Sequence, residues 1–172
     1  MYKEQSTNNN KAFLFLMMMM SCPFGCAPSE NQIREVVRQE MSNMFTREAI
    51  LDAKTIGPYS PAQRVGNFLF VSGQIGLNAQ TGKLENQDIE TETRQVLMNL
   101  MGVLNKAGYD SSDVISTTVY LKDMADFAKM NVVYSKNFQE GNYPTRATVQ
   151  VAALPRDARI EISAVAYKSR NK

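Results

Sequence analysis

The segment from Tyr143 to Ala166, YPTRATVQVAALPRDARIEISAVA, alternates apolar and polar residues with period two in two successive runs. Because side chains alternate between the two faces of a strand, this pattern predicts two strands, each with one buried face. The connection Leu154–Ala158 contains Pro155 and Asp157 and is short. We therefore expect the two strands to pair as an antiparallel hairpin.

The expected pairing determines which side chains share a face of the sheet. Matching apolar face to apolar face places Arg146, Thr148 and Gln150 on the same side as Glu161 and Ser163. Two interpretations of that side stay open. It is either a solvated surface, where an Arg146–Glu161 pair is worth less than about 1 kcal/mol, or a pocket where the planar guanidinium binds a carboxylate. On pattern alone the solvated surface is the simpler interpretation.

The remaining globular sequence predicts further strands and two helices. QRVGNFLFVSGQIGL indicates two strands around a turn at Gly66, and DVISTTVYL is rich in β-branched residues, as strands are. Asp88 is a predicted N-cap of one helix, which ends at a left-handed Gly108, and a second helix begins near Asp123. Its apolar stripe is Phe127, Met130, Tyr134 and Phe138.

The order of these elements is strands, helix, strand, helix, two strands. Helices of this length alternating with strands predict an α+β fold, in which two helices cover one face of a single sheet. The other face of that sheet is either solvated or packed on another copy of the chain.

Composition limits the chemistry of the chain. There is no histidine, so the usual general base and the commonest metal ligand are both absent from it. The two cysteines, Cys22 and Cys26, lie near the N-terminus and leave the globular region without a thiol nucleophile or a disulfide framework. A net charge of +2 argues against a protein that binds nucleic-acid backbones.

Residues 1–28 are predicted to form a separate signal-like or lipoprotein-like segment. An apolar run over residues 12–20 follows Lys11, and it is too short to span a bilayer but fits the apolar region of a secretory signal. Ser21 and Cys22 then resemble a bacterial lipoprotein processing site, in which Cys22 would carry the lipid anchor. Export or anchoring at a membrane, a disordered extension, and a mis-assigned start before a cytoplasmic protein all stay open.

Residues 29–46 are predicted to form a helical spacer. Ser29 and Gln32 have capping-box spacing before an apolar helical face. This helix either packs on the globular domain or separates that domain from a membrane anchor, and we favour the spacer. The globular domain is predicted to occupy residues 47–172.

The motifs IGPYSPA, FVSGQIGLN, TGKL and YPTRATVQVAALPRDARIEISAVA closely resemble, in order and spacing, the RidA/YjgF family of enamine/imine deaminases. The likeness runs from about Lys54 to Tyr167, and the first 46 residues have no counterpart in the compact members. It implies a chorismate-mutase-like α+β fold, assembled as a homotrimer with a ligand cleft at each subunit interface. It further implies a hydrolase of the 2-iminobutanoate/2-iminopropanoate deaminase type, which needs neither a metal nor an organic cofactor.

The same resemblance implies roles for individual residues. Arg146 would grip the carboxylate of a 2-imino acid, and Glu161 would hold the attacking water. Thr148 stands where many relatives carry cysteine, and its implied role is a backbone carbonyl that also holds water. The implied ligand-contacting positions besides Arg146 are Tyr59, Ser72 and Asn131.

Two other functions stay open at this point. A non-catalytic trimer could use Arg146 to bind a 2-keto acid or a similar carboxylate, but such a binder would not require Glu161. An endoribonuclease or translation inhibitor, an activity reported within the family, has little support because the charge is near neutral and no aromatic-basic platform occurs.

Overall fold

The structure is a computed structural model, and it describes residues 28–44, 46–50 and 56–169. The chain divides into two compact units, with the boundary between Phe45 and Thr46. The signal-like segment expected at the N-terminus, including Cys22, lies outside the described residues. Within the described ranges, none of the helices has the length and apolar character that a membrane span requires.

The described part of the first unit is helix α2 (Glu30–Met44). Its capping box is confirmed, because Gln32 donates its N–H to Ser29 Oγ at 3.3 Å while the Ser29 N–H donates to Gln32 Oε1 at 2.9 Å. Ile33, Val37 and Met41 follow one another at four-residue intervals and are exposed. The role of this helix as a spacer stays a prediction.

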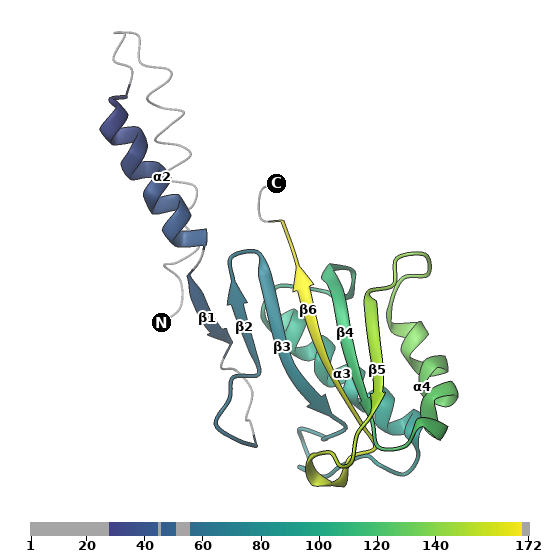
Figure 1. Ribbon diagram of the computed structural model, residues 1–172. Helices are drawn as coiled ribbons and strands as arrows, with labels where there is room; N and C mark the ends of the chain where they lie inside the picture. Colours follow the sequence, from purple (N-terminus) through teal and green to yellow (C-terminus); the bar gives the residue numbers. More distant parts are fainter. Residues whose placement is uncertain (1–27, 45, 51–55, 170–172) are drawn as a thin grey trace. The chain divides into compact units, whose positions relative to one another are not determined.

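The second unit contains one six-stranded sheet in the order β1-β2-β3-β6-β4-β5 (Figure 1). All neighbouring strands are antiparallel except β4 and β5, which are parallel. The strands are β1 (Arg47–Ile50), β2 (Ala62–Val65), β3 (Phe68–Ile75), β4 (Val114–Leu121), β5 (Thr145–Gln150) and β6 (Ile160–Tyr167).

Two helices, α3 (Ile89–Lys106) and α4 (Phe127–Tyr134), lie on the same face of this sheet (Figure 1). The Asp88 carboxylate accepts the Thr91 N–H at the start of α3, and Gly108 follows its end with φ of 80°, as the sequence predicts. The core lies between helices and sheet and includes Leu69, Val96, Leu100, Ile160 and Ile162. The predicted architecture of one mixed sheet covered on one face is confirmed.

The predicted hairpin between the last two strands is wrong. β6 lies between β3 and β4, whereas β5 lies on the other side of β4 and forms the edge of the sheet. The connection between β4 and β5 contains α4, and a crossover of that length joins parallel neighbours. Alternation of apolar residues had identified both strands, but it carries no information about which strands become neighbours.

The predicted common face of Arg146 and Glu161 is wrong for the same reason. Arg146 pairs with Thr117, which is 2% exposed beneath the helices, so Arg146 points to the helix-covered face. Glu161 pairs with Tyr120 and alternates with Ile160 and Ile162, which lie in the core. Glu161 therefore points to the opposite, open face. Which face a residue occupies depends on the partner strand, and each strand here has a different partner from the one expected.

Candidate functional site

Arg146 lies on the edge strand β5, and its side chain reaches toward helix α4. Its guanidinium carbon is 4.6 Å from the ring centre of Tyr134 and 5.7 Å from the ring centre of Phe127. Both distances are within the range of cation–π attraction. The charge of Arg146 is therefore held against two aromatic rings instead of against a carboxylate.

The N–H groups of the Arg146 guanidinium have no hydrogen bond or ion pair to any of the described residues. A guanidinium has five N–H donors in its plane, arranged as a fork that matches a carboxylate or a phosphate. These N–H donors are thus suited to an incoming planar anion, since none of the described residues accepts a hydrogen bond from them.

Tyr134 is the better fixed of the two rings. Its hydroxyl shares a 2.7 Å hydrogen bond with Thr117 Oγ1 on β4, and its ring lies 4.8 Å from that of Phe138. Burial raises the pKa of Tyr134, while the Thr117 hydrogen bond and the Arg146 charge lower that pKa by less. Tyr134 accordingly remains a neutral phenol at physiological pH.

Thr148 and Asn131 lie in the same region as Arg146. Thr148 is two residues further along the same face of β5, and its Oγ1 is buried without a hydrogen-bond partner among the described residues. Asn131 is four residues after Phe127 and three before Tyr134, a spacing that puts all three on one side of α4.

The backbone of β5 also presents unpaired groups at this edge. The Val151 N–H donates to the Leu121 carbonyl on β4. Because the direction of backbone groups alternates along a strand, the N–H and C=O of Thr148 point away from β4, toward the free edge of the sheet. The Thr148 carbonyl is thus placed to accept a hydrogen bond from outside the sheet.

Tyr59 and Ser72 come together on the other side of the unit. They line an open hollow of about 780 Å³, together with Gln63 and Phe70. Ser72 donates its hydroxyl to the Ser60 carbonyl at 2.8 Å and its N–H to the Pro61 carbonyl at 3.0 Å. These two bonds fasten the loop that carries Tyr59 to strand β3.

Glu161 is half-buried on the open face of β6, against Gly73 of β3. The Glu161 side chain lies over Gly73, so a Cβ at position 73 would collide with its carboxylate. Burial raises the pKa of Glu161 above its ordinary value. Gly73 directly follows Ser72, at an irregularity in the pairing of β3 with β6, so Glu161 lies beside the hollow that Ser72 lines.

The six predicted site residues thus form two groups in the described chain. Arg146, Thr148 and Asn131 lie where β5 meets α4, on the helix-covered side. Tyr59, Ser72 and Glu161 lie on or beside the hollow of the open face. The sheet separates the Arg146 and Glu161 side chains, so one chain by itself does not bring the two groups together.

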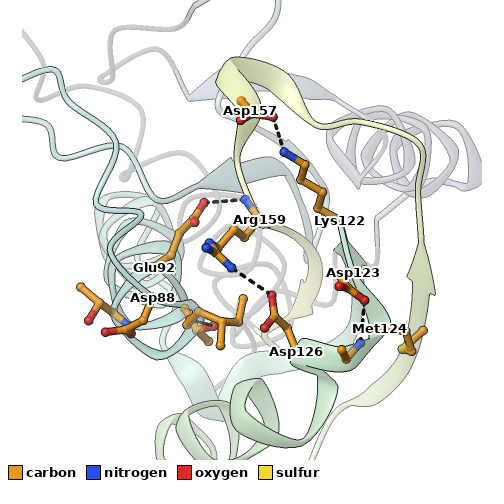
Figure 2. Close-up of polar contacts among 12 residues, drawn as sticks. Asp88, Glu92, Lys122, Asp123, Met124, Asp126, Asp157 and Arg159 are labelled. Atoms are coloured by element: carbon orange, nitrogen blue, oxygen red, sulfur yellow. Dashed lines mark hydrogen bonds and ion pairs between the residues drawn. The ribbon is translucent and has the colours of Figure 1, made fainter.

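A second cluster of polar side chains lies at the end of the sheet near the start of α4 (Figure 2). Glu92 of α3 is fully buried, and its Oε1 accepts the Arg159 N–H at 3.0 Å while its Oε2 has no partner in the described structure. The Arg159 guanidinium lies 3.6 Å from Asp126, and Lys122 contacts Asp157 nearby (Figure 2).

This cluster joins α3, α4 and the start of β6. Across the described ranges, no group of three or more carboxylate or cysteine side chains is placed to hold a metal ion. We therefore assign the cluster around Glu92 to the packing of the helices on the sheet.

Sequence reasoning missed the contribution of Phe127 and Tyr134. Both were expected in an apolar stripe of α4, and Tyr134 is indeed buried, but they also contact the guanidinium of Arg146. The pattern held no signal for this contact, because it depends on the parallel pairing that brings β5 beside α4.

Comparison with known proteins gives consistent matches over the second unit. A family model described as endoribonuclease L-PSP matches residues 48–168. A RutC family protein of Pyrococcus horikoshii is 53% identical over 125 residues, which cover 73% of this chain and 96% of that protein. The human 2-iminobutanoate/2-iminopropanoate deaminase is 44% identical over 131 residues, which cover 74% of this chain and 94% of the human protein.

A solved structure shows the same fold. The crystal structure of E. coli TdcF with bound serine is 37% identical and superposes with a TM-score of 0.66. The match covers 71% of this chain and all of that chain.

Proposed function

The chain belongs to the endoribonuclease L-PSP family, also called the RidA/YjgF family, and from this membership we propose that it hydrolyses 2-aminoacrylate and other 2-imino acids to 2-keto acids and ammonia. Relatives named as 2-iminobutanoate/2-iminopropanoate deaminase support this reaction class. The observation that carries the proposal is Arg146, whose guanidinium lies over two aromatic rings and makes no hydrogen bond or ion pair with the described residues, which leaves its N–H donors for a carboxylate.

In the proposed reaction the carboxylate of the 2-imino acid binds the Arg146 guanidinium, and a neighbouring C=N carbon is the electrophile. Water held by the Glu161 carboxylate and the Thr148 carbonyl adds its oxygen to that carbon. A proton passes to the nitrogen, the resulting carbinolamine expels ammonia, and the C=O of the 2-keto acid forms.

Modest catalysis is sufficient for this reaction. Imines hydrolyse in water unaided, so orientation and charge placement need to lower the barrier by only about 4–6 kcal/mol. The raised pKa of Glu161 brings its carboxyl closer to the pH at which a general base works well. The residues in these roles include no histidine, in agreement with the composition.

We propose that the two groups of site residues meet between copies of the chain, as in the homotrimer that the family resemblance implies. The open face of the sheet supports association, because Phe68, Phe70 and Tyr167 are 41–48% exposed on it with ring centres 5.1 and 6.4 Å apart. The sheet separates Arg146 from Glu161 within a chain, so in the proposed assembly one copy supplies Arg146 and another supplies Glu161.

Trapping with semicarbazide tests the proposed function. An amino acid oxidase generates the 2-imino acid in place, and the semicarbazone that forms is followed in the presence of the protein. We expect the wild-type chain to suppress the semicarbazone, and Arg146→Ala to suppress it much less. Equal traces for the two proteins would refute the mechanism.

The same preparation separates the enzyme from a non-catalytic carboxylate binder. A binder would take up a 2-keto acid, as measured by calorimetry, without changing the yield of semicarbazone. The proposed deaminase requires both effects to be lost in Arg146→Ala, and only the catalytic one to be lost in Glu161→Gln.

A further inference from the structure

We infer that Tyr134 and Phe127 are positioning residues for Arg146. The two rings orient its guanidinium so that the N–H donors at its edge meet the ligand carboxylate. The inference rests on the proposed function, since it concerns how the same carboxylate is recognised. Neither aromatic residue belongs to the six site positions that the family resemblance implies.

Two rings hold the guanidinium through interactions that leave its N–H donors free. Arg146 lies 4.6 Å from the Tyr134 ring centre and 5.7 Å from that of Phe127, and no described residue accepts a hydrogen bond from it. Cation–π attraction needs the charge over the face of an aromatic ring and no hydrogen bond from the guanidinium, whereas carboxylates bind through its N–H donors. The rings can therefore restrain Arg146 before the ligand arrives without competing for the ligand's place.

The Tyr134 ring is held from a strand that is itself paired with Arg146. Thr117 of β4 is the register partner of Arg146 on β5, and its hydroxyl is 2.7 Å from the hydroxyl of Tyr134. The ring of Phe138 also packs on that of Tyr134, with 4.8 Å between the ring centres. Thr117 thus fixes the Tyr134 ring from the strand beside Arg146, and that ring gives the exposed Arg146 side chain a contact on the helix-covered face.

Arg64 and Tyr109 form a second arginine–tyrosine pair in this unit, and there the arginine has a structural role. The Arg64 guanidinium lies 5.9 Å from the Tyr109 ring, but it also pairs with Glu48 at 2.7 Å and donates to the Ala107 carbonyl. Its fork is used inside the fold. At Arg146 the aromatic contacts are similar and the fork is left open, which is the difference expected between a residue that holds the fold and one that binds a ligand.

The pair around Arg64 also supplies a matched control. Tyr109 and Tyr134 are 3% and 4% exposed, and each has its hydroxyl hydrogen-bonded. We would prepare Tyr134→Leu, Tyr134→Phe, Phe127→Leu and Tyr109→Leu in the full chain. For each, calorimetry measures the Kd for 2-ketobutanoate, and competition with semicarbazide measures kcat and KM for the 2-imino acid.

For Tyr134→Leu we expect Kd and KM to rise about 10-fold while kcat changes about 2-fold or less, because a carboxylate grip acts equally on bound substrate and transition state. Tyr134→Phe keeps the ring and should stay within about 3-fold of the wild type. Tyr109→Leu should lower the melting temperature as Tyr134→Leu does, but leave Kd and KM unchanged. Phe127 is 36% exposed, so Phe127→Leu is expected to fold and to raise Kd about 3-fold.

The outcomes separate this inference from the proposed function. If the wild type neither binds 2-ketobutanoate nor removes imine, the proposed function is wrong. If the wild type does both and Arg146→Ala does neither, the proposed function is supported. In that case the positioning inference is overturned when Tyr134→Leu and Phe127→Leu have the same Kd as Tyr109→Leu. Should Tyr134→Leu fail to fold, Phe127→Leu alone decides, with an unchanged Kd overturning the inference.

Discussion

Glu161 is a half-buried carboxyl group, and in the proposed mechanism its protonation decides whether it can hold and activate water. Burial raises its pKa, so a larger fraction is protonated at mildly acidic pH than for an exposed glutamate. If the carboxylate is the active form, the rate of imine removal falls as the pH drops through this raised pKa.

We therefore expect the pH profile of the rate to have an acidic limb whose midpoint lies above the ordinary pKa of glutamate. Glu161→Gln should lose that limb, and its rate of imine removal should be about 100-fold lower than that of the wild type. Rates are measured by semicarbazide competition over a pH series and corrected for the uncatalysed reaction. An unchanged acidic limb in Glu161→Gln would assign the titration to another group.

Among the described residues, Glu92 is a second carboxyl group whose pKa burial raises, and because it lies in the packing of the helices on the sheet we expect it to affect stability. The N–H groups of Arg159 and Ile160 and the Arg159 charge lower this pKa by less, and Asp126 raises it. Because the folded-state pKa exceeds the unfolded one, the folded protein binds the extra proton. Its contribution to stability is full below the unfolded pKa and is lost as the pH rises through the folded pKa.

The expected result for Glu92→Gln is a gain in the free energy of unfolding that grows with pH, reaching about 1 kcal/mol at about pH 8. Gln can accept the Arg159 N–H without placing a charge at the buried Oε2 position. Denaturant unfolding at a series of pH values measures the difference. A constant offset between the two proteins would mean that Glu92 does not titrate in this range.

Between the elements β3 and β6, Gly73 leaves the space in which the Glu161 side chain lies, because a Cβ there would meet the Glu161 carboxylate. Gly102 on α3 is a matched control, since a Cβ at that position would meet no other atom within 4 Å.

We expect Gly73→Ala to displace Glu161 and reduce the rate of imine removal about 10-fold or more, with little change in the Kd for 2-ketobutanoate. Gly102→Ala should leave the rate unchanged and stabilise the helix by about 0.5–1 kcal/mol. Wild-type activity in Gly73→Ala would show that the position of the Glu161 carboxylate is not critical.

The elements also show how far sequence can predict this fold. The N-cap at Asp88, the left-handed Gly108 and the capping box at Ser29 depend on neighbouring residues, and all three are confirmed. The pairing of β5 with β4 depends on contacts between distant segments, and local alternation predicted a different partner. The opposed faces of Arg146 and Glu161 follow from that pairing and could not be predicted without it.

For the whole molecule, the open face of the sheet is the surface that we propose to mediate association between copies. It carries Phe68 and Phe70 on β3 and Tyr167 on β6, all exposed. Met98 on α3 is 66% exposed on the helix side and offers an apolar control residue away from the open face.

We expect the wild-type chain to sediment as a trimer, Phe70→Glu to sediment as a smaller species with loss of imine removal, and Met98→Glu to behave as the wild type. Circular dichroism checks that each variant keeps its secondary structure. A monomeric wild type with full activity would contradict a site shared between copies.

We propose that Arg146 binds the substrate carboxylate, and a comparison of two imines, one with and one without a carboxylate, tests this role. An amino acid oxidase supplies a 2-imino acid, an amine oxidase supplies an imine that lacks the carboxylate, and semicarbazide traps each. We predict that the wild-type protein accelerates hydrolysis of the 2-imino acid alone and that Arg146→Ala accelerates neither. Equal acceleration of both imines by the wild type, or full activity in Arg146→Ala, would contradict the account.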